Sequence, residues 1–214
     1  MIRKMLTRSL CCFFMLTLAS GTLLAQLKAT HVVHSPNVTP LENSAAPLKN
    51  IFTNLGPTPT NAYDDTNGLF VAGPSSLVGS QWVAVPFIPK ANSTVTQLQV
   101  AVGYYFYGTK GIIVGLYSDA AGTVGTALAT AMATNIPDFM TCCKLVTVNL
   151  TPTAVTAGTQ YWIGVTSDDT NAPDFTGIWE DSNLANLEAQ NNLMGGWSTS
   201  RNQWPAAAAK GTVP

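Results

Sequence analysis

The chain has 214 residues, of which 10 are Lys or Arg and 11 are Asp or Glu, so its formal net charge at pH 7 is −1. This length is enough for one well-buried domain, and a chain without a basic stripe is an improbable partner for nucleic acid. Only 10% of the residues are charged, whereas Thr, Ala, Asn and Gly are abundant, and such a neutral composition suits an extracellular protein.

Residues 1–25 have the pattern of a secretory signal peptide. Arg3, Lys4 and Arg8 form a positive segment, an apolar stretch runs over 10–18, and small residues lead to an expected cleavage after Ala25. The apolar stretch is short for a bilayer span, and no other segment reaches about 20 continuous apolar residues. We therefore expect a secreted, extracellular or periplasmic protein, with no membrane span in the mature chain.

The next segment, 26–49, contains several prolines without sustained periodicity, which predicts a flexible linker. From residue 50 onward, apolar side chains recur at every second position, and this period predicts half-buried strands. The alternating runs are Val83/Val85/Phe87, Leu98/Val100/Val102, Ile112/Val114/Leu116, Val146/Val148/Leu150 and Tyr161/Ile163/Val165. Short strands separated by Gly-containing turns predict an all-β protein, with one antiparallel β-sandwich domain over 50–204.

Four segments carry local signals of their own. Pro86 within a strand run predicts an edge strand or a bulge. The Ala-rich segment 126–134 follows a hairpin turn, which favours a strand, whereas 183–192 allows one short helix with Ser182 as its N-cap. The Ala-rich segment 205–214 is predicted to be a loose C-terminal tail.

Three stretches resemble a known family. They are Val114-Gly-Leu-Tyr-Ser-Asp-Ala-Ala-Gly-Thr-Val-Gly125, the segment 150–162 ending in Gly158-Thr-Gln-Tyr161-Trp162, and 82–89 together with 94–98. Together they resemble the secreted bacterial choice-of-anchor β-sandwich domains, type R in particular. The resemblance covers roughly residues 50–200 and implies a jelly-roll-like sandwich on a surface or secreted protein, without a common catalytic residue.

The histidines argue against several kinds of catalysis. His31 and His34 are the only two in the chain, and both lie in the predicted linker. A Ser-His-Asp, Cys-His or zinc site needs an imidazole that is held rigidly beside its partners.

Glu180 and Asp181 are adjacent, so on a strand they point to opposite faces and pair poorly for glycoside hydrolysis. We expect no enzymatic activity, with a glycoside hydrolase as the third-ranked function.

Two acidic stretches are candidates for a structural calcium ion. One contains Asp64, Asp65 and Asn67, and the other contains Asp168, Asp169 and Asp174. Calcium takes six to eight oxygen ligands from flexible loops. The alternative is that these side chains only stabilise turns, as Asp and Asn commonly do. No other cofactor is expected.

Aromatic side chains are the main candidates for ligand binding, because flat rings stack on the apolar faces of sugars while neighbouring amides bond the hydroxyls. The alternative is that these rings fill the second face of the sandwich. The predicted function is therefore adhesion or glycan binding at a cell surface, with a structural or assembly module of the envelope as the alternative. The candidate residues are Tyr105, Tyr107, Trp162, Trp179 and Trp197.

The cysteines form two adjacent pairs. Cys11 and Cys12 lie in the signal peptide, so Cys142 and Cys143 are the only cysteines of the mature chain. An oxidising compartment favours a bond between them, and this vicinal disulfide would shape a loop. Two buried thiols and bridges between chains remain the alternatives.

Overall fold

The computed structural model describes residues 47–56, 63–105, 107–182, 189–193, 196–200 and 203–214. Its regular structure there consists entirely of β-strands, and no described helix is long and apolar enough to cross a membrane. The thirteen strands are β1 (Lys49–Thr53), β2 (Tyr63–Ala72), β3 (Gln81–Phe87), β4 (Ser93–Val100), β5 (Val102–Tyr104), β6 (Ile112–Asp119), β7 (Val124–Ala133), β8 (Val146–Val155), β9 (Tyr161–Ser167), β10 (Thr176–Ser182), β11 (Ala189–Leu193), β12 (Gly196–Ser200) and β13 (Ala207–Thr212).

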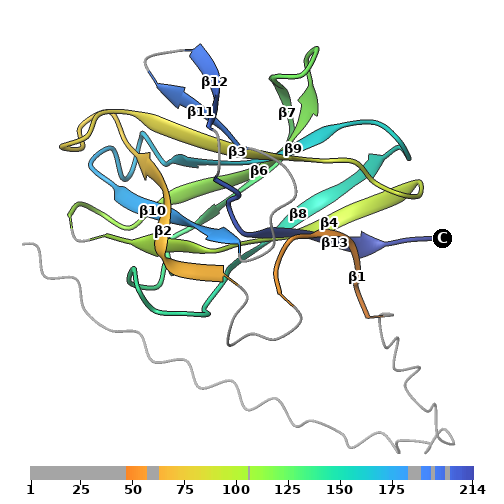
Figure 1. The fold of residues 1–214 in the computed structure, drawn as a ribbon, viewed down its shortest axis with the longest axis horizontal. Helices are drawn as coiled ribbons and strands as arrows, with labels where there is room; N and C mark the ends of the chain where they lie inside the picture. The colour runs from red at the N-terminus through yellow and green to blue at the C-terminus, as the bar shows by residue number, and fades with distance from the viewer. Residues whose placement is uncertain (1–46, 57–62, 106, 183–188, 194–195, 201–202) are drawn as a thin grey trace, which may run out of the picture. The chain divides into compact units, whose positions relative to one another are not determined.

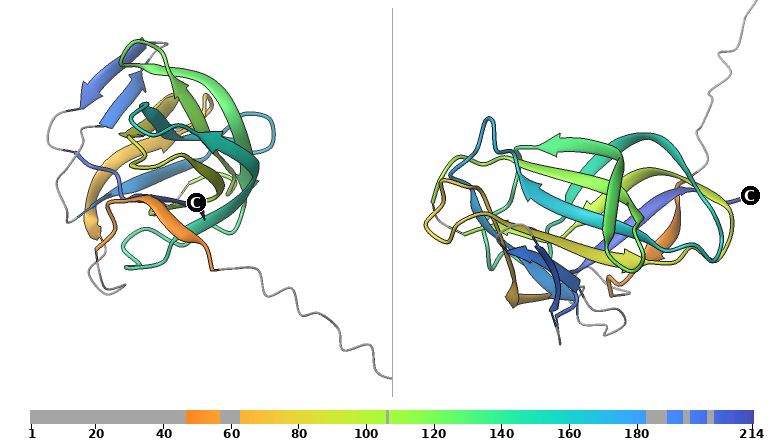
Figure 2. Two further views of the ribbon diagram at one scale, coloured as in Figure 1. Left: turned by 90° about the vertical axis from the view of Figure 1, so that its right-hand side faces the viewer. Right: turned by 90° about the horizontal axis from the view of Figure 1, so that it is seen from above.

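The strands form two antiparallel sheets (Figure 1). The small sheet has the order β1-β13-β4-β8. The large sheet has the order β5-β10-β2-β3-β9-β6-β7, and the β11–β12 hairpin pairs with β3 beside it. Figure 2 shows the large sheet curling around the small one. The predicted all-β sandwich is confirmed, whereas the jelly-roll connectivity that the family resemblance implies stays a prediction.

One hydrophobic core joins the two sheets, and it contains the strand faces that the sequence predicts. Leu98 and Val100 from β4 share this core with Ile163 and Val165 from β9, and all four are fully buried. The chain passes from the small sheet to the large one between Val100 and Val102. The alternating run Leu98/Val100/Val102 therefore contributes side chains from both sheets.

The prediction of a loose tail over 205–214 is wrong, because β13 occupies an inner position of the small sheet between β1 and β4. Ala206, Ala207, Ala208 and Ala209 are all fully buried. Alanine is depleted in strands, so the run carries no strand signal of its own. Its small side chains nevertheless fit a position that is crowded on both faces, and pairing along both edges sets its conformation. The sandwich therefore runs from Lys49 to Thr212.

Asn54 secures the end of this C-terminal strand. Its side chain donates to the carbonyl of Pro205 at 2.9 Å and accepts from the N–H of Ala207 at 2.7 Å, and Asn54 is fully buried. Its backbone N–H also donates to the Ala207 carbonyl at 3.1 Å. The side chain therefore extends the pairing of β1 with β13 beyond Thr53.

One local prediction is confirmed and two are corrected. The segment 126–134 lies almost wholly in strand β7. Pro86 marks neither an edge strand nor a bulge, because β3 lies between β2 and β9 and its register with β9 is regular from Val85 to Phe87. The short helix over 183–192 is wrong for 189–192, which belong to β11, and 183–188 lie outside the described residues. The signal peptide, His31, His34 and nearly all of the linker also lie outside them.

Candidate functional site

Aromatic side chains gather on the outer face of the large sheet, where strands β3, β9 and β6 lie side by side. Val83, Leu116 and Ile163 point into the core. Because side chains alternate along a strand, Trp82, Tyr117 and Trp162 must point outward. The register places Trp162 directly opposite Tyr117 on β6.

A row of very small residues crosses the same face. Gly164 on β9 pairs with Ala84 on one side and with Gly115 on the other. The Tyr117 ring lies over the two glycines, because a Cβ atom at Gly115 or Gly164 would stand only 2.7 or 2.8 Å from its Cε2 atom. Glycine is therefore required here for close approach, because the Tyr117 ring occupies the space that a side chain would need.

Tyr117 and Gly164 help to line a recess of about 90 Å³, called here the aromatic recess. The β11–β12 and β6–β7 hairpins stand on either side of it (Figure 1). Its lining residues are Trp82, Val83, Tyr117, Val124, Gly125, Gly164, Val165, Thr166 and Trp197, none of which carries a charge.

Strand register explains why two tryptophans far apart in sequence share the recess. Asn192 on β11 lies directly opposite Trp82 on β3 and directly opposite Trp197 on β12. Directly paired residues on antiparallel strands point to the same face of a sheet. The three residues therefore form a row on one face, with an amide between two indoles.

The hydrogen bonds of the indole N–H groups distinguish tryptophans that stabilise the fold from tryptophans that can bind a ligand. Trp179 is fully buried and donates its indole N–H to the Ala206 carbonyl at 2.9 Å. Trp162 is 2% exposed and donates to the Asp119 carboxylate at 2.9 Å. Within the described part of the chain, no partner is found for the indole N–H of Trp82 or of Trp197, or for the phenol of Tyr117. These three polar groups are available to a ligand.

Asp119 connects the β6–β7 turn to the start of β9, next to the aromatic recess. One of its carboxylate oxygens accepts from Trp162 and from the Gln160 amide at 2.7 Å, and the other accepts from the Gly122 N–H at 2.9 Å. The Gly122 bond is the main reason that the Asp119 pKa lies below its usual value, and the Trp162 and Gln160 bonds add to it. Asp119 is therefore ionised at neutral pH and fixes the β6–β7 turn, where Gly122 has a φ of 86°.

The structure keeps only part of the predicted ligand-binding set together. Trp197 lines the aromatic recess, but Trp162 is buried and does not line it, and Trp179 lies in the core, so neither is accessible to a ligand. Tyr105 and Tyr107 are 36% and 53% exposed and do not line it. Tyr105 instead packs edge-on against Phe70 and Phe139.

Sequence reasoning missed Trp82 and Tyr117, although the signal for both was present. Each directly neighbours an inward-facing residue of a recognised alternating run, Val83 or Leu116, and so had to face outward. What the sequence could not supply was the neighbour across the sheet.

The candidate calcium ligands act as turn-stabilising groups where their side chains are described. Asp168 accepts from the N–H groups of Thr170 and Asn171, and Asp169 is hydrogen-bonded to the Ser167 hydroxyl. Asp174 accepts from the N–H of Thr109 at 2.9 Å. Asn67 is exposed, and the side chains of Asp64 and Asp65 lie outside the described part. In that part no group of three metal-ligating side chains is found, so calcium stays a prediction.

The two cysteine sulfur atoms lie at disulfide distance, as the prediction of a vicinal pair requires. Cys142 is exposed and Cys143 is half-buried, so the pair is not a buried dithiol. The loop that carries them is held elsewhere, because the Tyr63 hydroxyl donates to the Lys144 carbonyl at 2.9 Å. Phe139 also donates its N–H to the Tyr104 carbonyl at 2.8 Å.

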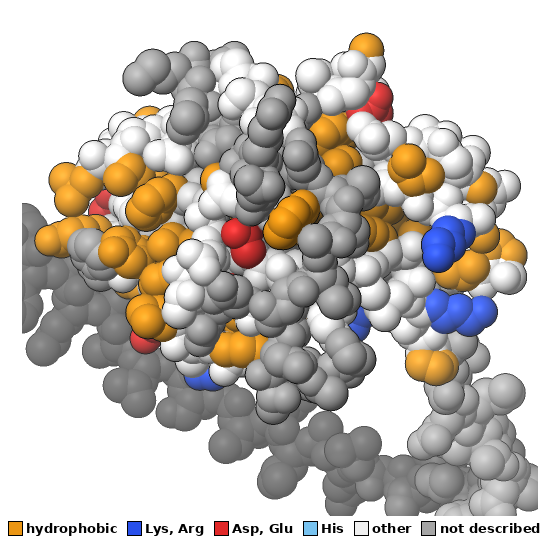
Figure 3. Space-filling model, in the orientation of Figure 1, with side chains coloured by type: hydrophobic (Ala, Val, Ile, Leu, Met, Phe, Trp, Pro, Cys, Tyr) orange, Lys and Arg blue, Asp and Glu red, His pale blue; other side chains and the backbone are white. Residues whose placement is uncertain are grey.

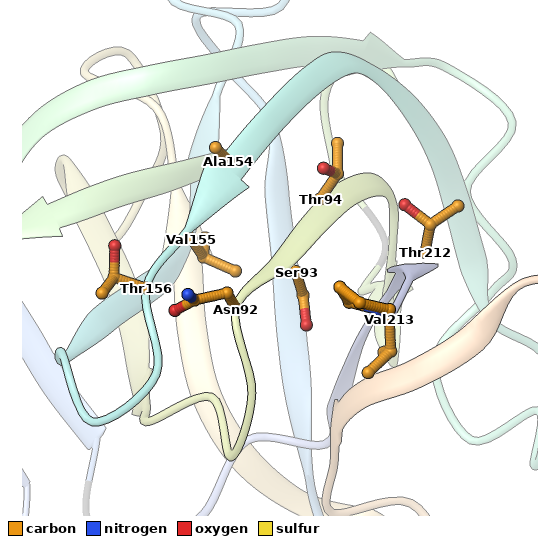
Figure 4. A pocket seen from close by; sticks show the side chains of 9 residues that line it. Asn92, Ser93, Thr94, Ala154, Val155, Thr156, Thr212 and Val213 are labelled. Carbon is orange, nitrogen blue, oxygen red and sulfur yellow. The ribbon is translucent and has the colours of Figure 1, made fainter.

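A larger pocket of about 480 Å³ lies at the ends of β4, β8 and β13 (Figure 4). Its polar side chains stabilise the adjoining turns: Asn92 accepts from the Ala157 N–H at 2.9 Å, and Ser93 donates to the Ala91 carbonyl at 2.9 Å. None of its nine lining residues is aromatic. It therefore provides no surface on which a sugar ring would stack.

The two carboxylates considered for hydrolysis, Glu180 and Asp181, are buried on β10, and neither lines the aromatic recess. The face shown in Figure 3 carries few charged side chains. No family model matches the chain, and no curated protein matches it in sequence. The resemblance to the choice-of-anchor domains therefore stays a prediction.

Proposed function

We propose that this protein is an exported, non-enzymatic glycan-binding module that binds sugar at the aromatic recess. The observation that carries the proposal is the pair of indoles, Trp82 and Trp197, which line one uncharged recess without a described hydrogen-bond partner for either N–H group. Tryptophans that only fill a core normally bond their N–H, as Trp162 and Trp179 do.

The recess suits a sugar for two physical reasons. An indole covers the apolar face of a sugar ring and excludes water from it, while its N–H donates to a hydroxyl or ring oxygen at the edge. Trp82 is 36% exposed, so its ring can be covered further by a ligand. An uncharged lining favours neutral sugars, because no side chain there pairs with a carboxylate or an ammonium group.

The test is a glycan array with the chain from residue 26 onward, followed by calorimetry with the best glycan. We expect Trp82→Ala and Trp197→Ala each to weaken binding about tenfold or more, since a truncated anchor residue costs on that order. Tyr107→Ala is the matched control, because Tyr107 is an exposed aromatic outside the recess. Equal losses in all three variants, or no binding to any glycan, would refute the proposal.

Export is part of the proposal, and it rests on the pattern of residues 1–25. The protein then works outside the cytoplasm, secreted or at the cell surface, with a glycan or another surface component as its partner. N-terminal sequencing of the exported protein should give Gln26 or a residue close to it. Retention of Met1 would contradict this expectation.

An assembly role is the second candidate, and strand β7 favours it. At one end of the large sheet, β5 is covered, because Tyr104 donates its N–H to the Pro137 carbonyl at 2.7 Å. At the other end, β7 has ten residues without a charge or a proline, and it pairs only with β6 among the described strands. The unpaired N–H and C=O groups of such an edge strand can form hydrogen bonds with a strand of another chain. Light scattering at increasing concentration tests this role, and Thr130→Lys should abolish any oligomer that forms through β7.

A further inference from the structure

The size of the aromatic recess limits what can enter it. A cavity of about 150 Å³ holds a benzene ring, and pockets that enclose a whole ligand have about 300 Å³ or more. At about 90 Å³ the recess is smaller than either. It accommodates a substituent of a few heavy atoms, while the sugar ring itself stays outside.

The lining specifies the chemistry of that substituent. The Tyr117 ring and Val124 provide apolar surface for a methyl group. Indole N–H groups are donors only, so Trp82 and Trp197 favour an acceptor such as a carbonyl oxygen. Thr166 donates its hydroxyl hydrogen to the Ser167 carbonyl at 3.0 Å, which leaves its oxygen to accept from an N–H group.

An acetamido group has all three features: a methyl, a carbonyl oxygen and an N–H, in four heavy atoms. We infer that the aromatic recess takes the acetamido group of an N-acetylated amino sugar, whose ring stacks on the exposed part of Trp82. This inference rests on the proposed glycan-binding function and narrows it to glycans that contain N-acetylhexosamine.

A matched pair of trisaccharides tests the inference. N,N′,N″-triacetylchitotriose and cellotriose have the same β-1,4-linked backbone, and they differ only in the acetamido or hydroxyl group at position 2. By calorimetry we expect triacetylchitotriose to bind about tenfold or more tightly than cellotriose, the factor that corresponds to one good contact. Equal affinities, or binding only to glycans without an acetamido group, would overturn the inference and leave the proposed function intact. Binding to no glycan would overturn both.

A variant that fills the recess gives an independent test. Val124→Phe places a ring where the acetamido group is expected, and Leu128→Phe adds the same ring on β7 at a site that is 41% exposed and outside the recess. We expect the first variant to lose the preference for triacetylchitotriose and the second to keep it. Melting temperatures of both variants establish that they are folded. A folded Val124→Phe variant with unchanged preference would overturn the inference.

Discussion

Trp162 and Asp119 join the two parts of the candidate binding site, through an indole N–H that donates to a carboxylate oxygen at 2.9 Å. Trp162 comes from β9, where it lies opposite Tyr117 of the recess lining, and Asp119 comes from the end of β6, where the hairpin wall begins. The same carboxylate accepts from Gln160 and Gly122. The shape of the recess therefore depends on one acidic residue that does not line it.

Asp119→Ala should weaken glycan binding while the sandwich stays folded, because the hairpin wall loses its hydrogen bonds to Trp162 and Gln160. Calorimetry measures the affinity, and a thermal melt confirms folding. Asp138→Ala is the control, since Asp138 is an exposed acid that pairs with Lys110, and neither residue lines the recess. Equal affinities of the two variants would show that Asp119 has no positioning role.

The melting temperature should also depend on the charge of Asp119 in a defined pH range. Its folded pKa is below the usual value of about 3.9, so its stabilising effect is complete above that value and is lost as the pH falls through the folded pKa. We expect the difference in melting temperature between the wild type and Asp119→Asn to be constant from pH 8 to about pH 5 and to narrow below about pH 4. A difference that narrows between pH 7 and 5 would contradict this assignment.

Asn54→Ala should destabilise the fold by about 1–3 kcal/mol, because it leaves the buried Pro205 carbonyl and Ala207 N–H without their side-chain partner. Urea unfolding measures the change. Asn149→Ala removes an exposed amide whose one partner among the described residues is the Gln97 side chain, and it should cost less than about 0.5 kcal/mol. Similar losses in the two variants would mean that the Asn54 contacts do not hold β13.

Val100→Asp should unfold the domain, because it places an unpaired charge in a fully buried position between the sheets. Gln99→Asp is the control at the adjacent position, which is half-buried and faces away from the core. Circular dichroism on heating should show a cooperative transition for Gln99→Asp and none for Val100→Asp. A wild-type melting temperature for Val100→Asp would mean that the strand faces the other way.

Reduction of Cys142 and Cys143 should change the loop over 137–144 locally and leave the sandwich folded. The loop that such a bond closes is minimal, and the stabilisation that a disulfide provides grows with loop length, so it is small here. Alkylation without reductant, followed by intact-mass analysis, should find no reactive thiol. Two alkylated cysteines, or a disulfide-linked dimer, would remove the vicinal bond.

The sequence by itself determined the strand faces. A side-chain period of two is a local property of extended backbone, so the runs at 98–102 and 161–165 predict their buried faces without any knowledge of the partner strands. The adjacency of Cys142 and Cys143 is equally local, and it allows a bond between neighbouring residues whatever the rest of the fold.

Only the tertiary structure decided the position of 207–212 and the composition of the candidate site. The Ala-rich strand lacks intrinsic strand propensity, and its conformation comes from pairing with β1 and β4 along its two edges. Trp82, Tyr117 and Trp197 are separated by 35 and 80 residues in the chain, and the register of β3, β6, β9, β11 and β12 brings them together. Register follows from contacts between distant segments, so alternation along one strand shows which side a residue faces but not which residue lies beside it.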